Sequence, residues 1–347
     1  MVQAEARPPV MADVARVAGV SHQTVSRVLN GHPNVRPDTQ ARVQAAIEEL
    51  GYQRNSSARA LVTRRSGVLG VVAFGTNLYG PASTLASIEH AAREAGYFVS
   101  MVSLRTITPQ TVHEAVEFLG QQAVEGFIVI APQRSAVDSL AQLPTSLPIV
   151  VVEGGDAPGH TVVCVDQAGG AAAATRHLLE MGHTTVWHIA GPADWLEAEG
   201  RVAGWRTALA ERGVTPPPLL RGDWSPRSGY HAARQLVERG IDQVSAVFVG
   251  NDQMALGVLR AFDEAKIDVP EDVSLVGFDD VPEAAYFSPP LTTVWQDFSA
   301  VGRRSIQLLL DHLAASEPNA QQVTVPTQLV QRSSVGVPHP RAATTNG

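Results

Sequence analysis

The sequence predicts a small all-α helix-turn-helix head followed by a larger α/β core made of two doubly wound parallel sheets. Residues 11–50 show helical spacing that one tight turn interrupts. From about residue 66, apolar β-branched runs alternate with amphipathic helical stretches, a pattern typical of parallel strands covered by helices on both faces. Because these runs are too many for one comfortable sheet, we expect two α/β subdomains.

The charge distribution favours a protein that contacts nucleic acid at one end. The 347 residues carry a net charge of −8. Residues 1–65 hold nine arginines against five acidic residues, a net charge of +4, and the remainder has a net charge of −12. An acidic body with a basic head suits binding to a polyanion through the head alone, with an accidental asymmetry as the alternative.

The first helix of the head is predicted over Asp13–Ala18. Its spacing places Val14, Val17 and Ala18 on one side, the side expected to face the core of the head. Gly19 and Val20 then form a tight turn.

The second helix, predicted over 22–30, begins after Ser21, whose hydroxyl can cap a free backbone amide of the first turn. Val25, Val28 and Leu29 are expected to be buried. The side chains that point outward are His22, Gln23, Ser26 and Arg27. Short polar groups with one arginine are what a helix in the major groove needs.

A third helix opens at Pro37 and runs to about Leu50, with Val43, Ile47 and Leu50 facing inward. Taken alone, this pattern fits any small three-helix unit.

The exact order of amino acids in two segments is much more specific than the spacing of their apolar residues. Residues 18–30 read Ala-Gly-Val-Ser-His-Gln-Thr-Val-Ser-Arg-Val-Leu-Asn, and residues 50–52 read Leu-Gly-Tyr. By these two segments the chain resembles the lac/gal repressor family of bacterial transcription regulators, and the resemblance covers nearly its whole length. Three further stretches are similar to the lac branch of that family: 222–225, 251–257, and 289–293 leading to 296–298.

The core elements follow from the apolar runs and from the helical stretches between them. Strands are predicted over 68–74, 98–104, 126–130, 149–152, 162–165, 186–190, 246–249 and 274–278. Helices are predicted over 84–95, 111–121, 169–181, 201–212, 228–239 and 253–265.

The resemblance implies a two-lobed core like that of periplasmic binding proteins, in which the chain crosses between the lobes near residues 165, 293 and 325. It divides the chain as follows: a DNA-binding head over 1–54, a hinge helix over 55–65, a sugar-binding core over 66–338, and a disordered tail over 339–347. The N-terminal lobe then comprises about 66–165 and 294–325, and the C-terminal lobe about 166–293 and 326–338. In the lac branch a helix with leucine heptads follows the core and joins dimers into tetramers. Since the tail of this sequence has no leucine heptads, a homodimer is expected.

The hinge Asn55–Val62 can form about two helical turns, and isolated helices this short are marginal in water. Ordering eight residues costs on the order of 10 kcal/mol, so the hinge is expected to order only on DNA. The resemblance implies that Leu61 wedges into the minor groove and that Ala58 makes the close contact between two hinge helices. Arg59 suits the negative potential of that groove. A plain linker is the alternative.

The family's mode of DNA binding assigns contacts to base edges and contacts to phosphates to this chain. His22, Gln23 and Arg27 read base edges, whereas other side chains contact the phosphates. The complete set of predicted DNA-binding residues is Met11, Ser21, His22, Gln23, Thr24, Ser26, Arg27, Asn30, Arg36, Asn55, Ala58, Arg59 and Leu61.

A ligand held between two lobes needs polar side chains at strand ends and an aromatic side chain that stacks on it. Sugars need both, because their hydroxyls donate and accept while the C–H face of the ring is apolar. The resemblance places the effector site at Leu78, Glu153, Arg201, Trp224, Asn251, Asp279, Gln296 and Phe298. The alternatives are that Asp279 caps a loop, that Arg201 is a surface residue of a helix, and that Trp224 belongs to the core.

Several departures from the family pattern bear on the ligand. Glu153 stands where the lac branch has the shorter aspartate, and of the positions Phe74, Leu78 and Gly80 only the leucine is retained. The loop 194–197 adds an aromatic side chain and acids beside Arg201. We expect a neutral mono- or disaccharide, with a galactoside as one candidate, because Asp279 and Glu153 would repel an anion.

The function implied is that of a transcriptional repressor of sugar-utilisation genes, which binds a near-palindromic operator as a homodimer and is released by its sugar inducer. A regulator whose ligand tightens DNA binding is the nearest alternative, and a periplasmic-type sugar-binding protein is the alternative from another class.

An enzyme is disfavoured, because the sequence has no P-loop, no Gly-x-Ser-x-Gly elbow and no catalytic triad. No cofactor or metal is expected, since His183 and His188 are more typical of a structural pair. Without an apolar span or a signal peptide the chain is expected to be cytoplasmic and to contact no membrane. Cys164 is expected to be a buried, inert thiol.

Overall fold

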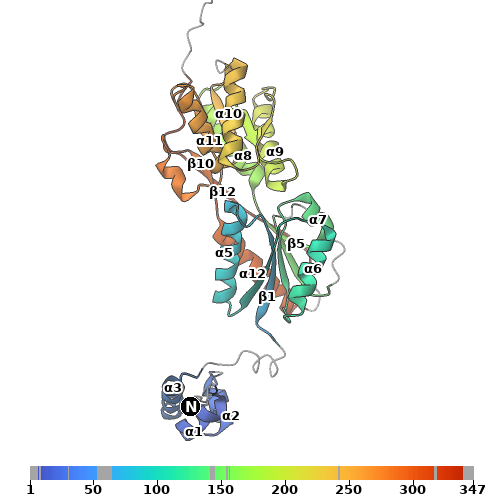
Figure 1. The fold of residues 1–347 in the computed structure, drawn as a ribbon, viewed down its shortest axis with the longest axis vertical. Helices are drawn as coiled ribbons and strands as arrows, with labels where there is room; N and C mark the ends of the chain where they lie inside the picture. Colours follow the sequence, from blue (N-terminus) through green and yellow to red (C-terminus); the bar gives the residue numbers. More distant parts are fainter. Residues whose placement is uncertain are drawn as a thin grey trace, which may run out of the picture. The chain divides into compact units, whose positions relative to one another are not determined.

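The computed structural model describes residues 7, 9–29, 31–52, 65–140, 145–153, 155, 157–240, 243–315 and 319–338. Two compact units result, Met1–Ser66 and Gly67–Gly347, and both are drawn in Figure 1. Some residues singled out in the sequence lie outside the described ones: Asn30, Asn55, Ala58, Arg59, Leu61 and the tail 339–347.

The head is a three-helix unit around a small apolar core. Its helices are α1 (Met11–Ala18), α2 (His22–Leu29) and α3 (Pro37–Leu50). Val14, Val25 and Val43 are fully buried and bring one side chain from each helix to the centre. Gly19 and Gly51 end α1 and α3 in the left-handed conformation that glycine adopts at little cost.

One predicted core residue of the head is wrong. Val17 is 38% exposed, and Ala15 occupies the core in its place. At 3.6 residues per turn, Val14, Ala15 and Ala18 form one stripe of α1, and Val17 falls beyond its edge. The two alanines let α1 pack closely on its neighbours.

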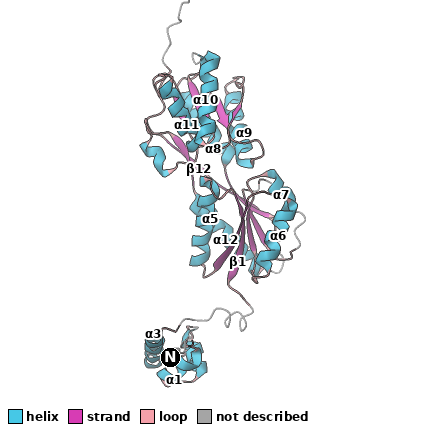
Figure 2. Ribbon diagram, in the orientation of Figure 1, coloured by secondary structure: helices cyan, strands magenta, loops and turns pink. Residues whose placement is uncertain are grey.

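The first sheet of the core has six parallel strands in the order β11-β5-β4-β3-β1-β2. The strands are β1 (Val68–Phe74), β2 (Phe98–Leu104), β3 (Phe127–Ile130), β4 (Ile149–Val152), β5 (Thr161–Val165) and β11 (Gln322–Val325). Helices α5 (Tyr79–Glu94) and α12 (Phe298–Ala314) cover one face, and α6 (Pro109–Gly120) and α7 (Arg134–Leu140) cover the other. Figure 2 shows these layers, the strands in magenta between cyan helices.

The second sheet of the core has four parallel strands in the order β7-β6-β8-β9. The strands are β6 (Trp187–Ala190), β7 (Leu220–Arg221), β8 (Ala246–Val249) and β9 (Ser274–Val276). Helices α8 (Gln167–Glu180) and α9 (Leu196–Glu211) pack on one face, and α10 (Pro226–Gly240) and α11 (Asp252–Glu264) on the other. Each sheet is therefore buried between helices.

A short antiparallel ladder lies where the chain passes between the two sheets. Strand β10 (Thr293–Gln296) pairs with β12 (Thr327–Val330), with Val294 opposite Leu329. A 3₁₀ helix, η2 (Pro282–Tyr286), precedes this ladder in the chain. The predicted fold class is confirmed: a small helical head and an α/β core with two parallel sheets.

Several elements differ from those predicted. Helices α5 and α9 begin at Tyr79 and Leu196, earlier than the sequence suggested, and α7, α12, β7 and β10–β12 had not been predicted. The expectation for Cys164 is wrong in part, because its side chain is only half-buried and lines a hollow at the end of β5. Burial nevertheless raises the pKa of the Cys164 thiol, which keeps it protonated.

Candidate functional site

The recognition helix α2 begins as the sequence predicts. The Ser21 hydroxyl accepts a hydrogen bond from the Thr24 backbone amide at 3.2 Å, which caps the first turn. Along the helix, His22, Gln23 and Arg27 are exposed, while Thr24 and Ser26 are half-buried. The side chains predicted to read bases therefore lie on the solvent side of α2.

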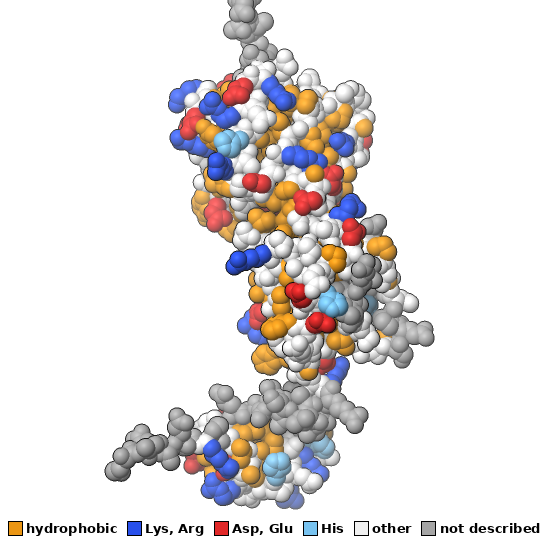
Figure 3. Space-filling view, turned by 45° about the vertical axis from the view of Figure 1, so that its right-hand side comes forward, with side chains coloured by type: hydrophobic (Ala, Val, Ile, Leu, Met, Phe, Trp, Pro, Cys, Tyr) orange, Lys and Arg blue, Asp and Glu red, His pale blue; other side chains and the backbone are white. Residues whose placement is uncertain are grey.

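The other two predicted DNA contacts that the structure describes lie on neighbouring helices of the head. Met11 is half-buried and packs against the core of the head, whereas Arg36 is exposed at the start of α3. Asp13 is engaged locally, because it accepts from the Val10 amide at 3.0 Å and pairs with Arg16 at 3.3 Å. Figure 3 shows basic and histidine side chains gathered on the head with few acidic ones among them.

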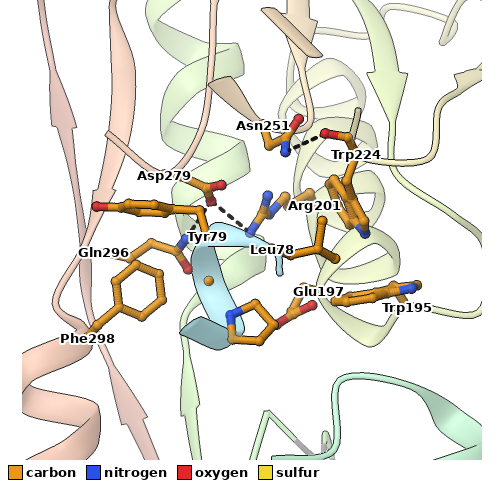
Figure 4. Close-up of a pocket in the computed structure, with 12 residues that line it drawn as sticks. Leu78, Tyr79, Trp195, Glu197, Arg201, Trp224, Asn251, Asp279, Gln296 and Phe298 are labelled. Atoms are coloured by element: carbon orange, nitrogen blue, oxygen red, sulfur yellow. Dashed lines mark hydrogen bonds and ion pairs between the residues drawn. The ribbon is translucent and has the colours of Figure 1, made fainter. Parts of the chain in front are cut away.

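A pocket lies between the two lobes of the core, where the carboxyl ends of strands from both sheets face each other. In open α/β sheets this edge is where ligands bind. Seven of the eight predicted effector residues line the pocket: Leu78, Arg201, Trp224, Asn251, Asp279, Gln296 and Phe298. Figure 4 shows them converging from separate elements. Their role in binding an effector stays a prediction.

Arg201 lies at the back of this pocket and is only 5% exposed. Its Nε donates to Gln167 Oε1 at 2.8 Å, one terminal nitrogen donates to the Gly250 carbonyl, and the other lies 3.5 Å from Asp279. The guanidinium also covers the ring of Phe278 at 3.9 Å from its centroid. These contacts fix the direction of the planar fork toward the pocket.

The hydrogen bonds of Arg201 belong to a closed ring of four side chains. Gln167 Nε2 donates to Gln296 Oε1 at 2.9 Å, and Gln296 Nε2 donates to Asp279 Oδ1 at 2.7 Å. Arg201 bonds both Gln167 and Asp279 and so completes the ring. All four residues are buried. Such a ring holds the polar wall of the pocket in one geometry before any ligand arrives.

Burial makes the acids of this region hard to ionise. It raises the pKa of Asp279 to about 6, although the neighbouring Arg201 opposes the shift. Behind it, burial and the charge of Asp279 raise the pKa of Asp252 well above its usual range, and Asp252 accepts from Thr293 Oγ1 at 2.6 Å and from the Val281 amide at 2.9 Å. Burial therefore favours the neutral form of both carboxyl groups.

Asn251 lines the pocket, but the protein already uses its amide group. Its oxygen caps α11 by accepting from the Met254 backbone amide at 2.9 Å. Its nitrogen donates to the Trp224 carbonyl at 3.2 Å and to Gln253 at 2.9 Å. The amide group of Asn251 therefore orients α11 and the backbone of Trp224.

Aromatic side chains form the other walls. Trp224 and Trp195 meet edge to face with centroids 5.7 Å apart, and Tyr79 and Phe298 do the same at 5.9 Å. Trp224 packs so closely on Gly191 that an added Cβ there would lie 2.2 Å from its ring. The buried Nε1 of Trp224 has no hydrogen-bond partner among the described residues.

Strained backbone accompanies these side chains. Glu153, Trp224 and Asp279 all have positive φ values, of 59°, 73° and 114°. Each residue follows a parallel strand at the edge that faces the pocket. Such conformations cost about 1–3 kcal/mol each in residues other than glycine and concentrate at functional sites.

Glu153 is the predicted effector residue that does not line this pocket. It is 7% exposed and accepts a hydrogen bond from the Val165 backbone amide at 3.0 Å. Its carboxyl group lines a neighbouring hollow, which also contains Cys164 and Glu197. Burial raises the pKa of Glu153 to about 7.

Five lining residues were absent from the predicted set: Tyr79, Gly80, Pro81, Trp195 and Glu197. The sequence signal for the last two was present, since the loop 194–197 stood out for its aromatic and acidic side chains. It was missed because α9 had been predicted to begin at Arg201. The helix begins at Leu196, which puts Glu197 one turn before Arg201 on the same helix.

The segment that carries Trp195 also connects the two lobes. The Leu196 amide donates to the Pro132 carbonyl at 2.8 Å, and the Arg134 amide donates to the Asp194 carbonyl at 3.2 Å. Gln133 Nε2 donates to Asp194 Oδ2 at 2.9 Å. The lobes are thus joined by direct hydrogen bonds at the edge of the pocket.

The described part of the chain contains neither a metal-binding cluster nor a membrane-spanning helix. No group of three or more His, Cys, Asp or Glu side chains there is placed to hold a metal ion. Instead, His183 bonds Ser245 and Ser274 at 2.9 and 3.0 Å, and His188 stacks on Phe248. Within the same residues, none of the helices combines the length and the apolar character that crossing a bilayer requires.

A helix-turn-helix head and a two-lobed core with a lined pocket are together the architecture of a DNA-binding transcription regulator. Residues 10–55 match the bacterial regulatory proteins of the lacI family, and residues 175–335 match the periplasmic binding protein-like domain. The lactose operon repressor of Escherichia coli K12 is 32% identical over 97% of this chain and 93% of its own length. The chain therefore belongs to the lacI family of DNA-binding transcription regulators.

Other relatives and solved structures agree with this assignment. The transcriptional repressor PurR of Proteus mirabilis HI4320 is 34% identical over 93% of this chain and 96% of its own length. The lac repressor dimer bound to operator and the anti-inducer ONPF is 32% identical, with a TM-score of 0.83 over 95% of this chain and 100% of the other. A complex of the regulator CelR with cellobiose is 31% identical, with a TM-score of 0.70 over 94% and 99%.

These relatives are transcription regulators, which confirms the prediction that the chain is not an enzyme. Regulators of the family respond to effector ligands and use no cofactor.

Proposed function

We propose that this protein represses sugar-utilisation genes as a homodimer bound to a near-palindromic operator, and that a small sugar held between the core lobes releases it. The observation that carries the proposal is the pocket, where a rigid polar wall around Arg201 faces aromatic walls that include Trp224. A sugar requires this pairing, because its hydroxyls need fixed hydrogen-bond partners and its C–H face needs an apolar surface.

The head supports the operator half of the proposal. The exposed side chains of α2 are two donors or acceptors, His22 and Gln23, and one cation, Arg27. Arginine and glutamine recognise guanine and adenine through paired hydrogen bonds in the major groove. Two heads related by a twofold axis read two half-sites one helical turn apart, which explains why we expect a near-palindrome. We place this activity in the cytoplasm, where the operator is accessible.

Relatives with bound ligands support the effector half. The lac repressor has been solved with ONPG, and CelR has been solved with cellobiose. Those sugars belong to those proteins. For this chain they support the class of ligand and leave its identity to experiment, with a galactoside as one candidate.

The connection between the pocket and the lobes offers a route for the response. Residues 194–197 contribute to the pocket through Trp195 and Glu197, and through Asp194 and Leu196 they bond the opposite lobe. A ligand that moves this segment changes the hydrogen bonds that join the two lobes. Moving occupancy of the operator from 99:1 to 1:99 requires about 5.5 kcal/mol of differential binding. The hinge hypothesis concerns residues outside the described ones and stays a prediction.

The test is a titration of the purified protein on its own upstream DNA, with and without a panel of sugars. At least one sugar should lower operator affinity by about ten-thousandfold, the ratio that corresponds to about 5.5 kcal/mol of differential binding. A sugar that raises operator affinity would reverse the polarity and make the protein one whose ligand tightens DNA binding. If no sugar changes operator affinity, the assignment of the pocket is wrong.

A further inference from the structure

Glu197 gives the pocket a carboxyl group that no other described residue pairs with. It lies in the first turn of α9 with its carboxyl group in the wall of the pocket. Figure 4 shows it with Trp195 on the side formed by the start of α9, opposite Asp279 and Gln296. Among the described residues it has no hydrogen bond and no ion pair, which is unusual for an acid in an enclosed site.

The nearest cation is already committed elsewhere. Glu197 and Arg201 have the spacing, i and i+4, at which a glutamate and a following arginine pair on a helix surface. Arg201 instead directs its guanidinium to Gln167, to the Gly250 carbonyl and to Asp279. Arg201 is the single cation among the residues that line the pocket, whereas Glu197 and Asp279 both line it. One carboxyl group is thus left over.

A second observation points to a ligand at the same place. The indole nitrogen of Trp224 is buried in the pocket wall and has no acceptor among the described residues. Trp195, which precedes Glu197 by two residues and is 6% exposed, meets the ring of Trp224 edge to face. Two aromatic rings and an unpaired carboxyl group therefore border one space, and one of the rings carries a donor without an acceptor among the described residues.

We infer that the effector is an amino sugar or a similar hydroxylated ring with a protonated amine, and that Glu197 with Trp195 selects it by binding the ammonium group. This inference rests on the proposed function and replaces the neutral sugar with a cationic one. An ammonium supplies the three donors that a carboxylate accepts and is attracted to the face of an indole ring. The ring hydroxyls then accept from Trp224 and bond the Arg201 wall.

The surroundings of Glu197 explain why its carboxyl group requires a cationic partner in order to ionise. Burial and the negative charges of Glu153 and Asp279 raise the pKa of Glu197, while Arg201 opposes the shift. Without a cation beside it this carboxyl group resists ionisation, and a ligand ammonium would stabilise its charged form. Binding of an amine therefore favours the ionised carboxyl group and should strengthen as the pH rises while the amine stays protonated, whereas binding of a neutral sugar should not gain in this way.

Calorimetric titration of the full-length protein without DNA tests the inference. The probes are galactosamine, glucosamine and mannosamine, each compared with its parent hexose and its N-acetyl derivative, which has the nitrogen but no charge. At least one free amine should bind about tenfold or more tightly than both of its neutral partners, as a charge-assisted hydrogen bond requires.

Variants assign the preference to one residue. Glu197→Gln should reduce the amine-to-hexose affinity ratio to near one, while Glu197→Asp, which retains the carboxyl group, should preserve a preference for the amine. Glu199→Gln is the matched control, because Glu199 lies in the same turn but pairs with Arg221 at 2.6 Å and does not line the pocket. It should keep the full preference.

The outcomes separate the two claims. If neutral hexoses bind and amines bind no better, the inference is wrong and the proposed function stands. An amine preference that survives in a folded Glu197→Gln protein would also overturn it. If no sugar of any kind binds, the proposed sugar effector fails, and this inference fails with it.

Discussion

Arg27 and Arg201 show how differently the two units of this molecule hold a recognition group. Arg27 is exposed on α2, whereas Arg201 is 5% exposed and tied to Gln167, Gly250 and Asp279. An exposed arginine can search for phosphates and bases on a large surface, and water solvates it until it finds them. A buried one has its geometry fixed in advance, which a small ligand with few contacts requires.

The two sites therefore differ in how far their contact residues contribute to the stability of the fold. The head keeps its candidate contacts outside its core, so a change there should affect DNA binding and leave folding alone. In the cleft the candidate contacts are part of the folded structure, because each supports the next around the ring. Mutation of the cleft should therefore affect stability and binding together.

The largest expected effect comes from Arg201→Met. The change leaves Asp279 without its cation and Gln167 and the Gly250 carbonyl without their donor. Breaking a buried pair in this way costs about 3–5 kcal/mol of the free energy of unfolding. Urea denaturation measures it, and effector binding should be lost as well.

The control for Arg201 is Arg176→Met. Arg176 also bonds a carboxylate, that of Glu211 at 2.7 and 2.8 Å, but both side chains are well exposed. Its loss should cost less than about 1 kcal/mol. Equal losses in the two variants would contradict the view that burial distinguishes them.

The second effect is a pH dependence that belongs to the cleft. Burial raises the pKa of Glu153 to about 7 in the folded protein, against an ordinary value of 4.5. The folded state therefore binds this proton more tightly than the unfolded chain, so the free energy of unfolding falls as the pH rises from about 4.5 to about 7. The fall is of the order of 3 kcal/mol at about 1.4 kcal/mol per unit.

Glu153→Gln checks this assignment, because glutamine keeps the acceptor for the Val165 amide and cannot ionise. Denaturation curves recorded at pH 5 and pH 7.5 should differ less in this variant than in the parent protein. Glu199→Gln, changed at an exposed ion pair, should retain the parent's difference. Identical pH profiles for all three proteins would show that the buried acid of Glu153 has no such influence.

The third effect is that of Arg27→Ala, which should change the affinity for DNA and leave the stability of the protein unchanged. Loss of one side chain that reads a base should weaken operator binding about 10- to 100-fold. The free energy of unfolding should stay within about 0.5 kcal/mol of the parent value, since the side chain is exposed. Fluorescence anisotropy on operator DNA and urea denaturation measure the two quantities.

Arg16→Ala provides the comparison within the head. Arg16 is also exposed, but it lies on α1 and pairs with Asp13 at 3.3 Å. Its removal should weaken operator binding less than removal of Arg27 does. A larger loss from Arg16 than from Arg27 would mean that α2 is not the helix that reads the bases.

The same contrast explains how much of the molecule could be predicted from its sequence. In the head, the residues that face outward are neighbours on one helix, so their spacing alone gave the exposed face of α2. Val17 was misplaced because the stripe of α1 contains Ala15, whose small side chain carries little apolar signal. Errors of this kind are local and small.

In the pocket, the family resemblance identified the polar residues that follow the strands. It could not predict the contacts between their side chains. Gln167 closes the ring with Arg201 and Gln296, yet it lies in a stretch with no motif and reaches its partners across the fold. Glu197 was overlooked because the start of α9 decides whether it faces the pocket. Long-range geometry of this kind is set by how the lobes pack.

The smallest expected effect tests whether the segment that joins the lobes acts as one contact. Gln133 Nε2 donates to Asp194 Oδ2 at 2.9 Å, from one lobe to the other. Asp194→Ala or Gln133→Ala should each lower effector affinity by less than about tenfold, the value of one exposed hydrogen bond. The backbone bonds of Leu196 and Arg134 remain in both variants and limit the loss.

A double-mutant cycle shows whether the two side chains act through each other. If they do, the variant with both changes should bind the effector as weakly as either single variant, because the second change removes nothing further. Fully additive losses would mean that the side chains act separately and that this hydrogen bond does not help to hold the lobes together. Because Asp194 is exposed, Gln133 is half-buried, and both belong to the core and are distant in sequence from the head, the head's free energy of unfolding should be the same in all four proteins.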